Sequence, residues 1–154
     1  MIKESKVDKE SQKTWRHITR SLGLDIGDKR IGVALSDPQG ILASPFTIIN
    51  RKDETLDIEA IIDIVNQQQV RHIVVGLPRS MDGSIGKQAE KVEAFTQKLC
   101  EHTEVPVEFR DERLTTVSAK RLRQAVNRKK TREKVRHDAI AAALILQGYL
   151  EEAY

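Results

Sequence analysis

The apolar residues of the chain recur with two periods, and the change between them separates strands from helices. Apolar side chains alternate with small or polar ones at 22–26 and 31–35, and a third apolar run covers 41–49. A period of two is typical of β-strands. The segments between these runs, 27–30 and 37–40, have the composition of tight turns. Because such short connections join antiparallel neighbours, the pattern predicts a three-stranded antiparallel meander.

Beyond Asp53 the pattern alternates between helical and strand-like segments. Asp53 is a suitable N-cap for a helix whose apolar residues recur at helical spacing up to Val65. The remaining segments are strands at 72–75 and 105–109 and helices at 89–99, 115–126 and 133–152. The last helix is apolar on nearly all sides, so we expect it to be buried.

This order of elements predicts an α/β fold with a mixed five-stranded sheet flanked by helices. Each helix between two strands is a crossover, so the first, fourth and fifth strands are parallel and the second is antiparallel to the first. The strand order 3-2-1-4-5 follows if the fourth strand lies beside the first. The order then reverses between strands one and four, and ligands of open α/β sheets bind at the carboxyl ends beside such a point.

Composition indicates one folded domain. Residues 1–19 are polar and are expected to form a disordered or weakly ordered tail, whereas 20–154 has the length of a single domain. Mean hydropathy is −0.46, and no apolar run approaches the roughly 18 residues of a membrane-spanning helix. The single cysteine, Cys100, and the lack of an apolar segment near the start predict a cytoplasmic protein.

Positive charge is concentrated in one part of the chain. The net charge is +3, yet 110–136 holds eleven lysine or arginine residues against three acids. Such a stretch is typical of a protein that binds a polyanion, most often nucleic acid. The alternative is a solvated helix face.

Three acids occupy positions where an acid is locally unfavourable. Asp25 lies inside the first strand, Glu112 directly follows the fifth, and Asp138 begins the apolar last helix. Asp25 shares a face with Gly23, and small residues there either clear space for the carboxylate or let a helix pack closely. The topology brings all three acids toward one end of the sheet.

Asp111 competes with Glu112 for the position after the fifth strand, because adjacent residues of a strand face opposite ways. Either acid could instead form an ordinary ion pair with Arg110 or Arg113. Asp138, likewise, could be satisfied by the amides of its own helix.

Clustered carboxylates repel one another unless cations neutralise them. Hard oxygen ligands without cysteine or paired histidines suit Mg²⁺ or Mn²⁺. Two such ions, about 3.5–4 Å apart, are the usual apparatus for cleaving phosphodiesters. The acids therefore predict a metal-dependent nuclease.

Four segments resemble the YqgF/RuvX family of RNase H-like proteins: Gly23–Ala34, Gly76-Leu77-Pro78, Asp111–Thr116 and His137-Asp138-Ala139. The resemblance covers about 20–150 and implies an RNase H-like fold. The family is described as nucleases for the 5′ end of pre-16S rRNA and as Holliday junction resolvases. It implies Asp25, Glu112 and Asp138 as the catalytic, metal-binding acids. Related resolvases carry a glutamate at the end of the fourth strand, where this chain has Gly76.

Nucleic acid is therefore the expected partner: structured RNA such as pre-rRNA, alone or in ribosomal precursor particles, or branched DNA. Backbone contacts dominate such binding. The basic residues expected to contact phosphates lie in the first turn, in the loop after the fourth strand and in the basic stretch: Lys29, Arg30, Arg79, Arg113, Arg128, Lys129 and Lys130. The sequence leaves open endo- or exonuclease action, and a monomer or a homodimer.

Two other functions fit the same pattern. An Asp-Ile-Gly sequence in a first β-hairpin also resembles the phosphate loop of actin-like ATPases, whose nucleotide site needs two such domains. A noncatalytic RNA-binding or ribosome-assembly protein could keep the fold without the activity. Calorimetry with magnesium-ATP separates the first from a nuclease.

Overall fold

The computed structural model describes residues 19–79, 86–112 and 137–152. The predicted tail, the helix expected at 115–126 and most of the basic stretch lie outside these residues. The described elements are β1 (Arg20–Ile26), β2 (Arg30–Ser36), β3 (Ala43–Asn50), α2 (Glu54–Gln67), β4 (Val70–Leu77), α3 (Lys87–Glu101), β5 (Val107–Asp111) and α5 (His137–Glu152).

The five strands form one sheet in the order β3-β2-β1-β4-β5, as the sequence predicts. β2 pairs antiparallel with both β1 and β3, whereas β1–β4 and β4–β5 are parallel. The order reverses between β1 and β4, so the carboxyl ends of these strands form the expected switch point.

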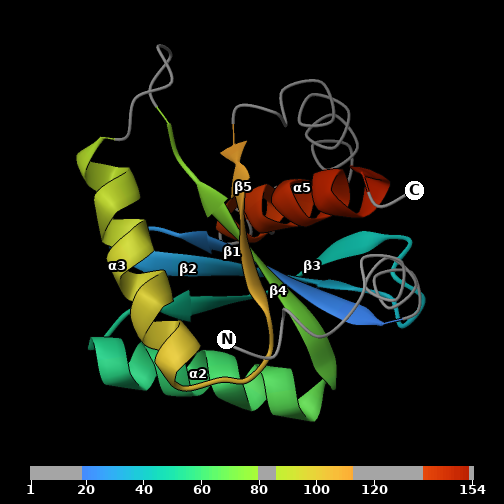
Figure 1. Cartoon of the computed structure of the whole chain (residues 1–154), viewed down its shortest axis with the longest axis horizontal. Helices are drawn as coiled ribbons and strands as arrows, with labels where there is room; N and C mark the ends of the chain where they lie inside the picture. The colour runs from blue at the N-terminus through green and yellow to red at the C-terminus, as the bar shows by residue number, and fades with distance from the viewer. Residues whose placement is uncertain (1–18, 80–85, 113–136, 153–154) are drawn as a thin grey trace, which may run out of the picture.

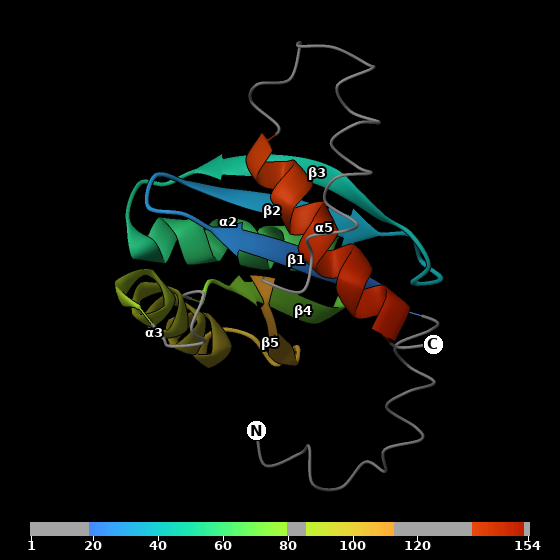
Figure 2. The same ribbon diagram turned by 90° about the horizontal axis from the view of Figure 1, so that it is seen from above.

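Helices cover both faces of the sheet (Figures 1 and 2). α5 crosses one face, and α2 and α3 lie on the other. Alternation along β1 sends Leu22 and Leu24 into the larger core, with Ile58 and Ile61 of α2. The smaller core on the opposite face is built mainly from α5. No described helix is both long and apolar enough to cross a membrane.

Glycine allows α5 to lie close to β1. A Cβ atom at Gly23 would lie 2.8 Å from the carbonyl oxygen of Ala142 and 2.8 Å from Cβ of Leu146. Real Cβ atoms do not approach other atoms so closely. The small-residue face thus accommodates the helix, which was one of the two interpretations of this pattern.

β4 extends two residues beyond the expected 72–75 at each end, and the boundaries of β3 and β5 also differ from the sequence expectation. β3 starts at Ala43 rather than at 41, because the Asp37 carboxylate accepts hydrogen bonds from the amides of Ile41 and Leu42 at 2.7 and 2.8 Å. These two residues therefore belong to the turn. β5 starts and ends two residues later than expected, so Asp111 is its last residue.

Candidate active site

Asp25 lies at the carboxyl end of β1, where its half-buried side chain is on the α5 face. It pairs with Gly32 across the β1–β2 ladder. Residues two apart in a strand share a face, so Asp25 follows Gly23 along the surface that α5 covers. A charged residue is tolerated here because the strand end is not sealed by the apolar core.

Glu112 directly follows β5, and its side chain reaches the end of β4. A Cβ atom at Gly76 would lie 2.7 Å from Oε1 of Glu112 and would overlap Cδ1 of Ile145. The carboxylate therefore occupies the space that a side chain at Gly76 would need. The family resemblance points to related resolvases with a glutamate at this strand end, and here the Glu112 carboxylate reaches the end of β4 from the residue after β5.

The carboxyl groups of Asp25 and Glu112 are hydrogen-bonded to each other. Burial raises the pKa of Glu112 to about 7, and the negative charge of Asp25, the hydrogen bond between them and the charge of Asp111 add to the effect. Two carboxylates this close cannot both ionise freely in the absence of a cation. A hydrogen bond between two carboxyl groups needs a proton on one of them, which agrees with the raised pKa of Glu112.

Asp111, the competitor of Glu112, is directed elsewhere. It pairs in register with Leu77 of β4 and lies 4.0 Å from Nε of Arg79. Arg110 pairs with Glu152 of α5, at 2.6 Å, rather than with either neighbouring acid. The structure thus brings the carboxyl of Glu112 into contact with that of Asp25 and places Asp111 beside Arg79.

Asp138 is the second residue of α5, and its side chain lies outside the described part of the structure. Ala142 crosses β1 at Gly23, and Gln147 accepts a hydrogen bond from the amide of Ala43, which pairs with Ser36 at the end of the sheet where β1 begins. The first turn of α5 therefore lies toward the carboxyl end of β1.

The predicted phosphate-binding residues are only partly described. Lys29 and Arg30 are exposed around the β1–β2 turn, and Arg79 lies beside Asp111. Arg113, Arg128, Lys129 and Lys130 lie outside the described residues.

The described donors fit a divalent metal ion in chemistry. Asp25 and Glu112 supply hard carboxylate oxygens, and the pKa of Glu112 is raised by burial first and then by the nearby charges of Asp25 and Asp111, which a dication would offset. No group of three or more His, Cys, Asp or Glu within the described residues is arranged for a metal. Asp138 would have to complete the set.

Sequence reasoning missed two polar residues on the other face of the sheet. Asp57 is only 2% exposed and pairs with Arg51 at 3.0 Å. Asp57 stands four residues before Ile61 on the apolar stripe of α2, and an acid in that stripe was the available signal.

Known sequences place the chain in a family. The family model described as "RuvX: Holliday junction resolvase" matches residues 19–152, nearly the whole chain. The chain belongs to the RuvX family. A relative from Caldanaerobacter subterraneus subsp. tengcongensis, named "Putative pre-16S rRNA nuclease", is 49% identical over 133 residues, covering 86% of this chain and 96% of the relative. A relative of the same name from Moorella thermoacetica is 47% identical over 132 residues, covering 86% and 94%.

Solved structures show the fold that this RuvX protein shares with junction resolvases. T. thermophilus RuvC in complex with a Holliday junction substrate superposes with a TM-score of 0.61 at 12% identity, covering 87% of this chain and 96% of RuvC. The yeast mitochondrial Holliday junction resolvase Ydc2 has a TM-score of 0.57 at 12% identity, covering 96% and 86%. The sheet is therefore of the RNase H-like, resolvase type.

Proposed function

We propose that this RuvX protein is a metal-dependent nuclease that cleaves a phosphodiester bond at the 5′ end of the precursor of 16S rRNA. The observation that carries the proposal is the contact between Asp25 and Glu112 at the switch point of a resolvase-type sheet. The names of the relatives support the RNA substrate. Action on ribosomal precursors also supports a cytoplasmic location.

In this proposal Asp25, Glu112 and Asp138 hold two Mg²⁺ or Mn²⁺ ions. When bound, such ions supply an activated water and stabilise the charge on the leaving oxygen. The chain's own contribution is to hold the acids on three separate elements and to leave the space beside Gly76 free for the Glu112 carboxylate. Because Glu112 has a pKa of about 7 in the metal-free protein, cation binding competes with a proton there.

Lys29 and Arg30 are exposed next to Asp25 along the chain, and we assign them to the substrate's phosphates. Arg79, Arg113, Arg128, Lys129 and Lys130 complete the proposed nucleic-acid track. Arg79 would exchange its ion pair with Asp111 for a phosphate contact.

The decisive experiment is cleavage of a 5′-labelled RNA that spans the start of 16S rRNA, with Mg²⁺ or Mn²⁺ and with EDTA. Asp25→Asn should abolish cleavage without unfolding the protein, and Asp63→Asn, which removes an exposed acid of α2, should leave it unchanged. Cleavage in EDTA, or by Asp25→Asn at the wild-type rate, would reject the proposed site.

Branched DNA is the second candidate substrate, favoured by the description of the family model. A labelled four-way junction in the same assay decides between the two. Cleavage of the junction but not of the RNA would assign this chain to DNA.

A further inference from the structure

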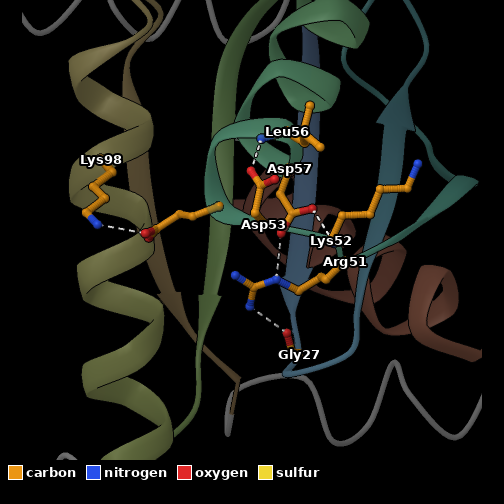
Figure 3. A network of polar contacts seen from close by, with 8 residues as sticks. Gly27, Arg51, Lys52, Asp53, Leu56, Asp57 and Lys98 are labelled. Carbon is orange, nitrogen blue, oxygen red and sulfur yellow. Dashed lines mark hydrogen bonds and ion pairs between the residues drawn. The ribbon is translucent and has the colours of Figure 1, made fainter.

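Arg51 holds the β1–β2 turn from the face of the sheet opposite the candidate active site. It directly follows β3, and its backbone amide donates to the carbonyl of Lys29 at 2.9 Å. Its Nη1 donates to the carbonyl of Gly27 at 3.0 Å, as Figure 3 shows. One residue thus binds two carbonyls of the four-residue turn that begins two positions after Asp25.

The guanidinium of Arg51 is itself held by α2 and α3. Its Nε donates to Oδ2 of Asp57 at 3.0 Å, and Oδ1 of Asp57 accepts from the amide of Lys52 at 3.0 Å (Figure 3). The ring of Phe95, from α3, lies 5.0 Å from the guanidinium carbon. The Arg51 side chain, 23% exposed, is thus contacted by the Gly27 carbonyl, the buried Asp57 carboxylate and the Phe95 ring.

The β1–β2 turn adds to the support that β2 gives the backbone of Asp25. The register between β1 and β4 runs from Arg20 to Leu24, whereas that between β1 and β2 continues to Ile26. Asp25 therefore lies beyond the last residue pair with β4, and its backbone is held by β2 and by the turn. A turn that moves would carry the Asp25 carboxylate with it.

Stability alone is a weak explanation for a buried ion pair, because desolvation of the charges offsets much of their attraction. The planar fork of arginine can donate to a carboxylate and a carbonyl in fixed directions at once, which a lysine ammonium cannot do. The arrangement is therefore suited to fixing an orientation.

We propose that Arg51, oriented by Asp57, is a positioning residue of the active site that holds the β1–β2 turn and thereby the carboxylate of Asp25. This inference rests on the proposed nuclease function. It adds a support on the far side of the sheet, contributed by the end of β3 and the start of α2.

The test compares Arg51→Lys and Asp57→Asn with a matched control, Lys98→Gln. Lys98 pairs with Glu54 at 2.7 Å and also links α3 to α2, but it does not touch the turn (Figure 3). Cleavage kinetics with Mn²⁺, melting temperature and amide hydrogen exchange are measured for all three. Amide hydrogen exchange does not require activity, so it tests whether Arg51 holds the β1–β2 turn even if the wild type cleaves nothing.

Arg51→Lys and Asp57→Asn should lower kcat about 10- to 100-fold, the scale expected when a catalytic group is displaced by about 1 Å. Exchange should quicken at the amide of Gly27, which donates to Arg30 at 2.9 Å, and stay unchanged at 22–24. Lys98→Gln should behave as wild type in both measurements.

Three results would overturn the inference: wild-type kcat in Arg51→Lys, unchanged exchange at Gly27, or faster exchange throughout the sheet. The last would mean that the pair serves global stability. If the wild type has no nuclease activity but exchange at Gly27 quickens in Arg51→Lys, the proposed function is rejected, whereas the role of Arg51 in holding the turn stands.

Discussion

At the scale of single residues, two neighbouring acids have different environments. Glu112 contacts Asp25 and has a pKa raised to about 7, whereas Asp111, one residue earlier, lies 4.0 Å from Arg79. The difference arises because Asp111 is the last residue of β5 and Glu112 is the first beyond it. Substitution of Glu112 and substitution of Asp111 should therefore have different effects.

Glu112→Gln should lower cleavage by at least about 100-fold, the scale on which loss of one electrostatic stabiliser of a transition state acts. Asp111→Asn should cost less than about 10-fold, because its carboxylate faces Arg79 rather than Asp25. Single-turnover kinetics with Mn²⁺ measure both. Equal, complete loss in the two variants would show that Asp111 also serves the metal site.

The pKa of Glu112 also predicts how the metal-free protein responds to pH. The ordinary value, 4.5, applies to the unfolded chain, and the folded value is about 7, so between these values the folded state binds more protons than the unfolded state. Stability contributed by this group must then fall as pH rises from about 5 to 8. The loss is complete above the folded pKa.

In EDTA, the melting temperature of Glu112→Gln should therefore exceed that of the wild type at pH 8, with a smaller difference at pH 5. Asp63→Asn should follow the wild type at both. Mn²⁺ at pH 8 should raise the melting temperature of the wild type more than that of Glu112→Gln. A pH-independent difference between Glu112→Gln and wild type would contradict the assigned pKa.

At the scale of elements, α5 and the sheet meet through glycines that serve different purposes. Gly23 lets the helix backbone approach, whereas Gly76 leaves room for Ile145 and for the Glu112 carboxylate. Gly148 of α5 lies against the guanidinium of Arg110. The close approach at Gly76 is at the candidate site, whereas that at Gly148 is at the far end of α5.

Gly76→Ala should abolish cleavage, because its Cβ would lie 2.7 Å from Oε1 of Glu112 and displace it. Overpacking of this kind costs about 1–3 kcal/mol, so the melting temperature should fall while the protein remains folded. Gly148→Ala is the control: its Cβ would press on the end of the Arg110 side chain, which can move, so cleavage should survive. An active Gly76→Ala would show that Glu112 tolerates another position.

At the scale of the whole molecule, positive charge is concentrated in one segment of the chain. The net charge is only +3, yet 110–136 is strongly basic, and most of it lies outside the described residues. A basic track of this kind acts by neutralising phosphates and releasing counterions. Its contribution is measured by salt dependence rather than by affinity at one salt concentration.

Replacing Arg128, Lys129 and Lys130 together with glutamine should weaken RNA binding and flatten the slope of log affinity against log salt. Each lost phosphate contact removes about 0.7–0.9 from the slope. Fluorescence anisotropy over a salt series measures it, with Lys87, Lys91 and Lys98 of α3 replaced together as the control of equal charge. Cleavage at saturating substrate should persist. Equal slopes for the two triple variants would argue against a track in the basic stretch.

Local patterns in the sequence predicted the described elements and, with the fourth strand placed beside the first, the strand order. Alternation identified β1 and β2, short turns required antiparallel pairing, and crossover helices required parallel β4 and β5. These features depend only on neighbouring residues and on chain connectivity. The boundaries of β3 and β5 shifted by two residues, because the Asp37 side chain binds the amides of the turn and because the β4–β5 pairing extends to Asp111.

Only the tertiary structure decided which residues meet. The contact of Glu112 with Asp25 depends on the β4–β5 register and on the space beside Gly76 that the Glu112 carboxylate enters, and local patterns in the sequence specify neither. The Arg51–Asp57 pair likewise could not be predicted from local patterns, because its contacts join segments that lie apart in the sequence: the end of β3, the start of α2 and the β1–β2 turn. Periodicity specifies which face a side chain is on. What it contacts on that face is set by how separate elements pack.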